Sequence, residues 1–187
     1  KLGEDQVSEV FRVRLEDRLA VVKRVRDNVP TVFREENVGA VEKKLTSIRC
    51  SSLVKTLHLG EGFLVQEYAE GWDLHDEILQ RQMLPHHRVS SVAKEVGAAL
   101  SALHAAGLVH RDITRRSVRC SVSGFQLVDL GLCEPGPELI PGPERFVAPE
   151  VRRGASRSPA SDMYSFGVLL YEAVSGEECP QEGPDQA

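Results

Sequence analysis

A lysine and two aspartates stand at separate points of this chain in settings that suit phosphoryl transfer. Lys23 ends the run Ala-Val-Val-Lys, Asp112 closes the tripeptide His-Arg-Asp, and Asp129 opens the tripeptide Asp-Leu-Gly. Such a transfer needs a cation on the phosphate oxygens, a carboxylate that holds Mg²⁺ and a second carboxylate that orients the acceptor hydroxyl. The three residues are candidates for these roles, provided that the fold brings them to one cleft.

Two further motifs follow in order, Ala-Pro-Glu at residues 148–150 and Ser-Asp-Met-Tyr-Ser-Phe-Gly at residues 161–167. The order and spacing of these motifs resemble the eukaryotic protein kinase family. Residues 113–116 lack the lysine usual in Ser/Thr kinases, which makes the chain look closer to the tyrosine-kinase or tyrosine-kinase-like branch. The resemblance implies an α+β, bilobal protein-kinase-like fold. It has a small β-sheet N-lobe with one helix and a mainly helical C-lobe, truncated after the αF-type helix.

The resemblance also implies a role for each candidate residue. Lys23 and Asp112 are the implied catalytic residues, the lysine on the phosphates and the aspartate at the acceptor hydroxyl. The implied metal ligands are Asp129 and Ser117, with Mg²⁺ as the metal. ATP is the implied nucleotide, and the residues expected to contact it are Gly3, Val10, Val21, Lys23, Glu67 and Ala69.

Several of these positions depart from the family pattern. Ser117 stands where the family usually has an asparagine, and a hydroxyl is a poorer Mg²⁺ ligand than an amide carbonyl. In the glycine-rich loop only Gly3 and Val10 match. Asp5 and Ser8 replace two glycines there, and a side chain keeps the backbone away from phosphates.

The purine end of the expected cleft departs as well. Val21 replaces the usual alanine, and Arg119 falls where an apolar floor residue is expected. Residues 129–150 contain no Ser, Thr or Tyr, so phosphorylation within this segment cannot switch the domain on. These changes all weaken the case for full activity.

Two hypotheses follow about function. The altered positions favour a weak or inactive domain, a pseudokinase that works as a signalling or scaffolding module. The matches at Lys23, Asp112 and Asp129 favour the alternative, an active ATP-dependent kinase that phosphorylates protein hydroxyls. The motifs at residues 148–150 and 161–167 argue against a small-molecule phosphotransferase. In both hypotheses the expected partner is a protein.

The elements that must position Lys23 read as a small sheet with one helix. Two β-rich runs, residues 7–15 and 18–25, predict a hairpin that turns at Glu16-Asp17. Runs at residues 53–59 and 62–68 predict two more strands. Apolar residues at helical spacing predict an amphipathic helix over residues 34–48.

The helix over residues 34–48 should supply the glutamate that pairs with Lys23. An ungapped count places Val41 at this position, and a one-residue gap places Glu42 there. Val41 belongs to the apolar stripe of the helix, which favours its facing inward. Both alternatives stay open from the sequence.

Helical patterns dominate the rest of the chain. A long helix should end at Gly107, a residue type that readily adopts the left-handed conformation. Residues 121–128 predict a short hairpin. An apolar helix over residues 163–174 should begin at a cap formed by Ser161 or Asp162.

These elements divide the 187 residues into three parts. We expect an N-lobe at residues 1–68, a partial C-lobe at residues 69–176 and a flexible tail at residues 177–187. A full kinase domain is longer, so the chain reads as a fragment.

Composition limits the setting in which the protein works. The formal net charge of -5 argues against a nucleic-acid-binding protein. No apolar run is long enough for a membrane span. The four cysteines lack metal-ligand spacing and are expected to be reduced thiols. We therefore expect a cytoplasmic protein, or the cytoplasmic part of a larger one.

Overall fold

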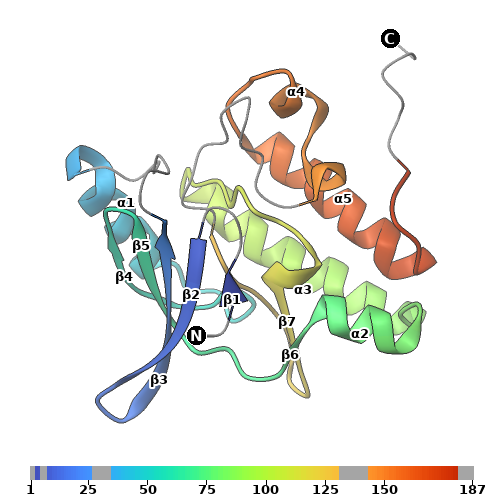
Figure 1. The fold of residues 1–187 in the computed structure, drawn as a ribbon, viewed down its shortest axis with the longest axis horizontal. Helices are drawn as coiled ribbons and strands as arrows, with labels where there is room; N and C mark the ends of the chain where they lie inside the picture. Colours follow the sequence, from blue (N-terminus) through green and yellow to red (C-terminus); the bar gives the residue numbers. More distant parts are fainter. Residues whose placement is uncertain (1–2, 5–7, 27–34, 131–142, 181–187) are drawn as a thin grey trace.

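The computed structural model describes residues 3–4, 8–26, 35–130 and 143–180. Its first part is a five-stranded antiparallel sheet with one helix beside it (Figure 1). The strand order is β1-β2-β3-β5-β4. The strands are β1 (Gly3–Glu4), β2 (Ser8–Leu15), β3 (Arg18–Val25), β4 (Thr56–Gly60) and β5 (Phe63–Glu67).

The β2–β3 hairpin carries Lys23 on a central strand. It turns at Glu16-Asp17, and Glu16 takes the positive φ of 53° that this turn needs. Lys23 pairs with Val10 on one side and with Leu64 of β5 on the other. Because β3 is held from both sides, the backbone of Lys23 is fixed. The predicted hairpin is confirmed.

The helix α1 (Glu35–Ser47) forms where the helical spacing predicted one, and it covers β4 of the sheet. Val38, Val41 and Leu45 lie on its inner face and pack against the hydrophobic core. Leu45 is buried, with 5% of its surface exposed. This burial stabilises the helix more than its intrinsic propensity does.

The second part is mainly helical and contains a small three-stranded sheet in the order β6-β7-β8. Two long helices, α3 and α5, lie side by side in it (Figure 1). Its elements are β6 (Trp72–Asp73), α2 (Leu74–Arg81), α3 (His86–Ala105), η1 (Arg115–Ser117), β7 (Val118–Ser121), β8 (Gly124–Leu127), η2 (Glu144–Phe146), α4 (Pro149–Arg152) and α5 (Pro159–Ser175).

The helix α2 was not predicted from the sequence. Its start is marked by Asp73, whose carboxylate accepts a hydrogen bond from the backbone N–H of Asp76 at 2.9 Å. Leu74 and Ile78, one turn apart, are both buried. An N-cap followed by an i, i+4 apolar pair was therefore the available signal.

The apolar helix α5 begins earlier than predicted. Its N-cap is Ser158, whose hydroxyl accepts from the N–H of Ser161, and Pro159 occupies the first turn. The cap proposed at Ser161 or Asp162 is thus wrong, because Ser161 is the third helical residue of a capping box. Gly176 ends the helix with φ 74°, in the left-handed conformation that glycine readily adopts.

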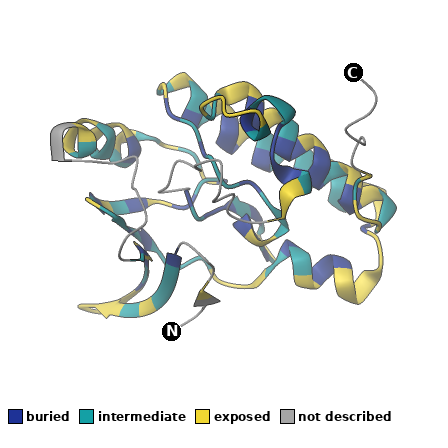
Figure 2. Ribbon diagram, turned by 45° about the horizontal axis from the view of Figure 1, so that its top comes forward, coloured by how far each residue is buried: buried dark blue, intermediate teal, exposed yellow. Residues whose placement is uncertain are grey.

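One hydrophobic core joins the sheet to the helices. Leu64 of the sheet, Leu100 and Leu103 of α3, and Phe166 and Leu169 of α5 all belong to it. Figure 2 shows the buried positions concentrated in the long helices, whereas the tip of the β2–β3 hairpin is exposed. No described helix is both long and apolar enough to span a membrane.

Backbone hydrogen bonds link the two parts next to the cleft. The N–H of Leu127 donates to Ser52 O at 2.8 Å, and the N–H of Val54 donates to Leu127 O at 2.9 Å. Leu127 ends β8, two residues before Asp129. The approach to Asp129 is therefore tied to the segment that leads into β4.

Candidate active site

The loop around Asp112 is held from below by α5. The carboxylate of Asp162 accepts hydrogen bonds from the N–H groups of His110 at 2.7 Å and Arg111 at 2.9 Å. His104 Nε2 lies 2.9 Å from the same carboxylate. Arg111 adopts φ 73°, a conformation that non-glycine residues rarely take. The Asp162 bonds stabilise this bend, which directs the next residue toward the cleft.

His110 is a structural residue of this loop. Its Nε2 donates to Val128 O at 2.9 Å, and its Nδ1 accepts from the N–H of Asp112 at 3.3 Å. Burial lowers the pKa of His110, because the charged ring would lose its hydration. A neutral imidazole with one donor and one acceptor nitrogen fits these partners.

Lys23 and Asp112 meet directly in the cleft. Lys23 Nζ lies 3.1 Å from Asp112 Oδ2 and 3.4 Å from the backbone oxygen of Asp129. The lysine side chain is 6% exposed and the aspartate side chain 25% exposed. The ammonium from the sheet therefore contacts the Asp112 carboxylate and the backbone of Asp129, and all three residues line one cavity.

Asp129 sits in a strained and poorly hydrated position. Its φ is 62°, and its N–H donates to Gln66 Oε1 at 3.4 Å. Burial raises the pKa of the Asp129 carboxyl; the Lys23 ammonium opposes this shift and the Asp112 carboxylate adds to it. The ionised form would therefore gain from a cation bound beside it.

Ser117 is committed to its own loop. Its hydroxyl donates to Thr114 O and accepts from Thr114 N–H, both at 2.9 Å. Thr114 in turn caps the short helix η1. The hydroxyl thus stabilises the turn that follows Asp112.

A cavity of about 590 Å³ lies between the sheet and the helical part. Of the nine residues predicted for the site, eight line it: Val10, Val21, Lys23, Glu67, Ala69, Asp112, Ser117 and Asp129. Gly3 pairs with Val10 in the sheet, and its neighbour Glu4 lines the cavity instead. Residues 5–7 of the expected glycine-rich loop, including Asp5, lie outside the described residues.

Two guanidinium groups flank the end of the cavity formed by residues 67–73. Arg119 donates to Gly71 O, and Arg116 Nη1 lies 3.4 Å from Asp73 Oδ2. Arg119 is therefore at the cavity, as its sequence position predicted. Asp73 and Arg116 were missed as cavity residues, because the helix that Asp73 caps was itself not predicted.

The choice between Val41 and Glu42 resolves in favour of an inward-facing Val41. The Glu42 carboxylate accepts from the N–H of Leu59 at 3.2 Å and contacts His58 Nδ1. The hydrogen bond from the Leu59 N–H makes the largest contribution to lowering the pKa of the Glu42 carboxyl, and the bond with His58 makes the next largest. Glu42 is thus directed to β4, and not to Lys23.

A second ionic cluster was not found from the sequence. Glu172 of α5 is fully buried, and it contacts Arg145 of η2 and Arg115 of η1. The three residues are far apart in the chain and belong to no spacing pattern. Only the packing of η1 and η2 on α5 brings them together.

The family model of the protein kinase domain matches residues 1–187. The chain belongs to the protein kinase family. A solved structure of Rad53 in complex with AMP-PNP superposes with a TM-score of 0.76 at 21% identity, covering 99% of this chain and 49% of that one. At this identity the likeness shows the fold, which confirms the expected kinase-like architecture.

Two similar curated proteins come from bacteria. The serine/threonine-protein kinase PknL of Mycobacterium tuberculosis (strain H37Rv) is 37% identical over 122 residues, or 61% of this chain and 31% of its own length. The serine/threonine-protein kinase pkn3 of Myxococcus xanthus is 28% identical over 199 residues, or 94% of this chain and 36% of its own length. The chain thus spans about a third of these relatives.

The expected closeness to the tyrosine-kinase branch is wrong. The relatives found are named serine/threonine-protein kinases. The expectation relied on a missing lysine within residues 113–116. A single local substitution is a weaker signal than similarity spread over more than half of the chain.

Proposed function

We propose that this kinase domain binds ATP and Mg²⁺ in the cleft at Lys23 and transfers phosphate weakly or not at all. In this proposal it acts mainly as a signalling or scaffolding module that binds proteins. The proposal keeps the division into an N-lobe at residues 1–68, a partial C-lobe at 69–176 and a tail at 177–187. It also keeps a cytoplasmic setting.

The cavity supports nucleotide binding. Its volume of about 590 Å³ falls within the range of small-molecule sites. Val10 and Val21 line it with apolar surface, and Lys23 supplies a buried cation for phosphate oxygens. Glu67 and Ala69 border it where the chain passes from the sheet to the helices, and their backbone groups would bind the purine.

The carboxylates support a Mg²⁺ that is shared with phosphates. Among the described residues, no group of three or more His, Cys, Asp or Glu side chains is arranged to hold a metal ion. Mg²⁺ commonly binds through one or two carboxylates together with substrate phosphates. Asp129, with its raised pKa, is the residue that would hold it. The metal would neutralise charge on the phosphates.

One observation carries the proposal of weak transfer: the hydroxyl of Ser117 is used by Thr114. It forms two hydrogen bonds there, each of 2.9 Å. A residue bound in this way is a poor second ligand for Mg²⁺. The pairing of Lys23 with Asp112 adds to this, because phosphate binding must first separate the two side chains.

The alternative is an active serine/threonine kinase. It is favoured by the convergence of Lys23, Asp112 and Asp129 on one cavity, and by the names of the relatives. In this case Asp112 leaves Lys23, accepts the proton of a substrate hydroxyl and orients its oxygen. The two candidate functions differ in the rate of phosphate transfer, and not in the placement of Lys23, Asp112 and Asp129.

A phosphotransfer assay with labelled ATP and a generic protein acceptor separates them. We expect slow transfer by the unchanged protein and none by Asp112→Asn. Ser117→Asn restores an amide ligand, so it should raise the rate about tenfold, equal to 1.4 kcal/mol of barrier. A rate of about 1–100 s⁻¹ in the unchanged protein would establish the active alternative instead.

A further inference from the structure

We propose that Arg115 and Arg145 form a recognition site for an acidic side chain of a protein partner. The site lies outside the nucleotide cavity and uses residues that the proposed phosphotransfer does not. It rests on the proposed function only in that the partner is a protein. It applies equally to a weak and to an active domain.

A buried glutamate fixes both arginines. Glu172 has no exposed surface, and its Oε1 accepts from Arg145 Nε at 2.5 Å and from the N–H of Cys179 at 3.3 Å. Its Oε2 lies 3.0 Å from Arg115 Nε, a charge contact that is not an aligned hydrogen bond. One carboxylate thus holds two guanidinium groups from different segments.

This arrangement prepares the arginines for a further anion. The single buried carboxylate balances one of the two guanidinium charges, and the second charge is met only by the exposed carboxylate of Glu178. The Arg115 and Arg145 side chains are only 11% and 15% exposed, so they are already ordered before any partner binds. Binding to ordered side chains loses less conformational entropy than binding to free ones.

Donor groups remain on both guanidinium planes. In the described part of the chain Arg115 uses only its Nε, toward Glu172. Arg145 uses Nε toward Glu172 and Nη2 toward Glu178. Arginine has five N–H donors in a fixed fork that matches a carboxylate. The unused donors could therefore hold a second acidic group.

The protein itself shows that the site accepts a carboxylate. Glu178 Oε1 lies 3.0 Å from Arg145 Nη2, and the Glu178 side chain is 69% exposed. Ion pairs of such exposed side chains contribute little to stability. Glu178 is thus a weakly held occupant that an acidic residue of a partner can displace.

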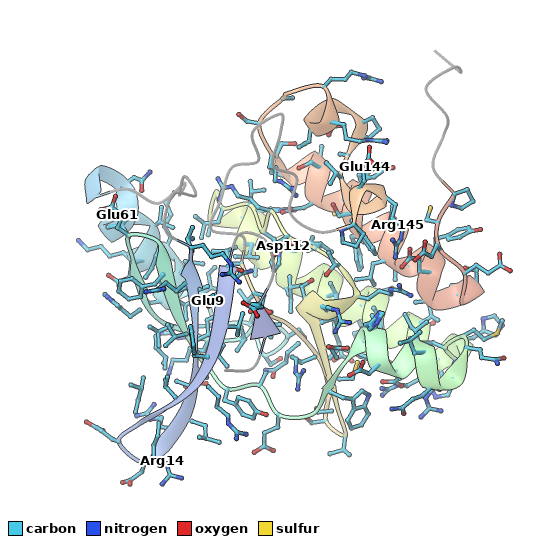
Figure 3. All side chains as sticks on the ribbon, viewed as in Figure 1. Glu9, Arg14, Glu61, Asp112, Glu144 and Arg145 are labelled. Carbon is cyan, nitrogen blue, oxygen red and sulfur yellow. The ribbon has the colours of Figure 1, made fainter. Side chains whose placement is uncertain are left out.

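The position of the site relates it to the catalytic loop. Arg115 follows Asp112 by three residues. Figure 3 shows Arg145 beside α5, next to Glu144 and on the same part of the molecule as α4. A partner segment held by Arg115 therefore lies next to the loop that would receive the acceptor hydroxyl.

Fluorescence anisotropy with three labelled peptides tests the proposal without nucleotide. The peptides differ only in the residues around one serine, which are glutamate, glutamine or lysine. We expect the glutamate peptide to bind about tenfold more tightly than the glutamine peptide, the effect of roughly one charge-assisted hydrogen bond. Added salt should reduce this preference.

Variants connect the preference to the site. Arg115→Gln with Arg145→Gln should abolish it, whereas the exposed Arg153→Gln is a matched control that should keep it. Glu178→Gln removes only the exposed competitor, so it should fold normally and bind the glutamate peptide about threefold more tightly.

Equal binding of the glutamate and glutamine peptides would overturn the proposal. So would a preference that persists in the double variant, or one unchanged by Glu178→Gln. A phosphoserine peptide is tested as well. If the phosphoserine peptide binds and the glutamate peptide does not, the site does not recognise carboxylates and the proposal is contradicted. A native circular dichroism spectrum with cooperative melting would show that each variant is folded.

Discussion

At the scale of single residues, Asp129 shows a conflict between stability and function. Its φ of 62° strains the folded backbone, and its raised pKa shows that burial disfavours the ionised side chain. Such a residue persists in proteins when the strained position has a use. In the proposed function, this use is to hold a cation beside the Asp129 carboxylate.

Asp129→Asn should therefore stabilise the protein at neutral pH. Because folding raises the pKa of this carboxyl, its protonated form stabilises the folded state relative to its ionised form. This contribution to the free energy of unfolding is fully present below the ordinary pKa and is lost as the pH rises through the folded-state pKa. The gain from Asp129→Asn should thus appear at pH 7 and vanish below about pH 3.8, the ordinary value. Melting curves at both pH values measure it. A lower melting temperature at pH 7 would contradict this account.

Glu172 should contribute more to stability than any exposed ion pair of the domain. Glu172→Ala leaves two largely buried guanidinium groups without their carboxylate, which should cost about 3–5 kcal/mol in the free energy of unfolding. The matched control is Glu144→Ala, because Glu144 is 63% exposed and pairs with Arg152 at 3.8 Å. The control should lose less than about 1 kcal/mol. Similar losses in urea unfolding would refute the role of burial.

At the scale of elements, α5 organises the helical part. It supplies Asp162 to the loop before Asp112 and Glu172 to the arginine site. Its N-cap therefore affects both sites through the placement of the helix. Ser158 and Ser161 form that cap reciprocally.

Removing this cap should destabilise the domain modestly. Ser158→Ala deletes the acceptor for the Ser161 N–H and should cost about 1 kcal/mol. Ser90→Ala, at an exposed position of α3, is the control and should stay within about 0.5 kcal/mol of the unchanged protein. Urea unfolding compares the two. Equal free energies of unfolding for the two variants would show that the cap does not stabilise α5.

The elements also show what the sequence could and could not supply. The hairpin that carries Lys23 and the motifs that carry Asp112 and Asp129 were readable, because local pattern and order determine them. The α2 helix was missed, since its cap at Asp73 resembled an ordinary connector. The register of α1 stayed ambiguous by one residue, and only its packing on β4 directs Glu42 away from Lys23. Glu172 with its arginines is a tertiary feature that no local pattern encodes.

At the scale of the whole molecule, one core supports a sheet and a helical part with a cavity between them. The sheet supplies Lys23, and the helical part supplies Asp112 and Asp129. A ligand that bridges the two parts binds only the folded state, so it must stabilise the protein. The central claim is therefore that this cavity is a nucleotide site in which Lys23 takes part.

The most direct measurement is the thermal shift produced by ATP with and without Mg²⁺. At 100 times its dissociation constant the ligand should stabilise the unchanged protein by about 2.7 kcal/mol. That amounts to roughly 5–10 °C for a domain of this size. The shift should be smaller without Mg²⁺, should be lost in Lys23→Met and should persist in Arg153→Gln. No shift in the folded, unchanged protein, or an equal shift in Lys23→Met, would contradict the account.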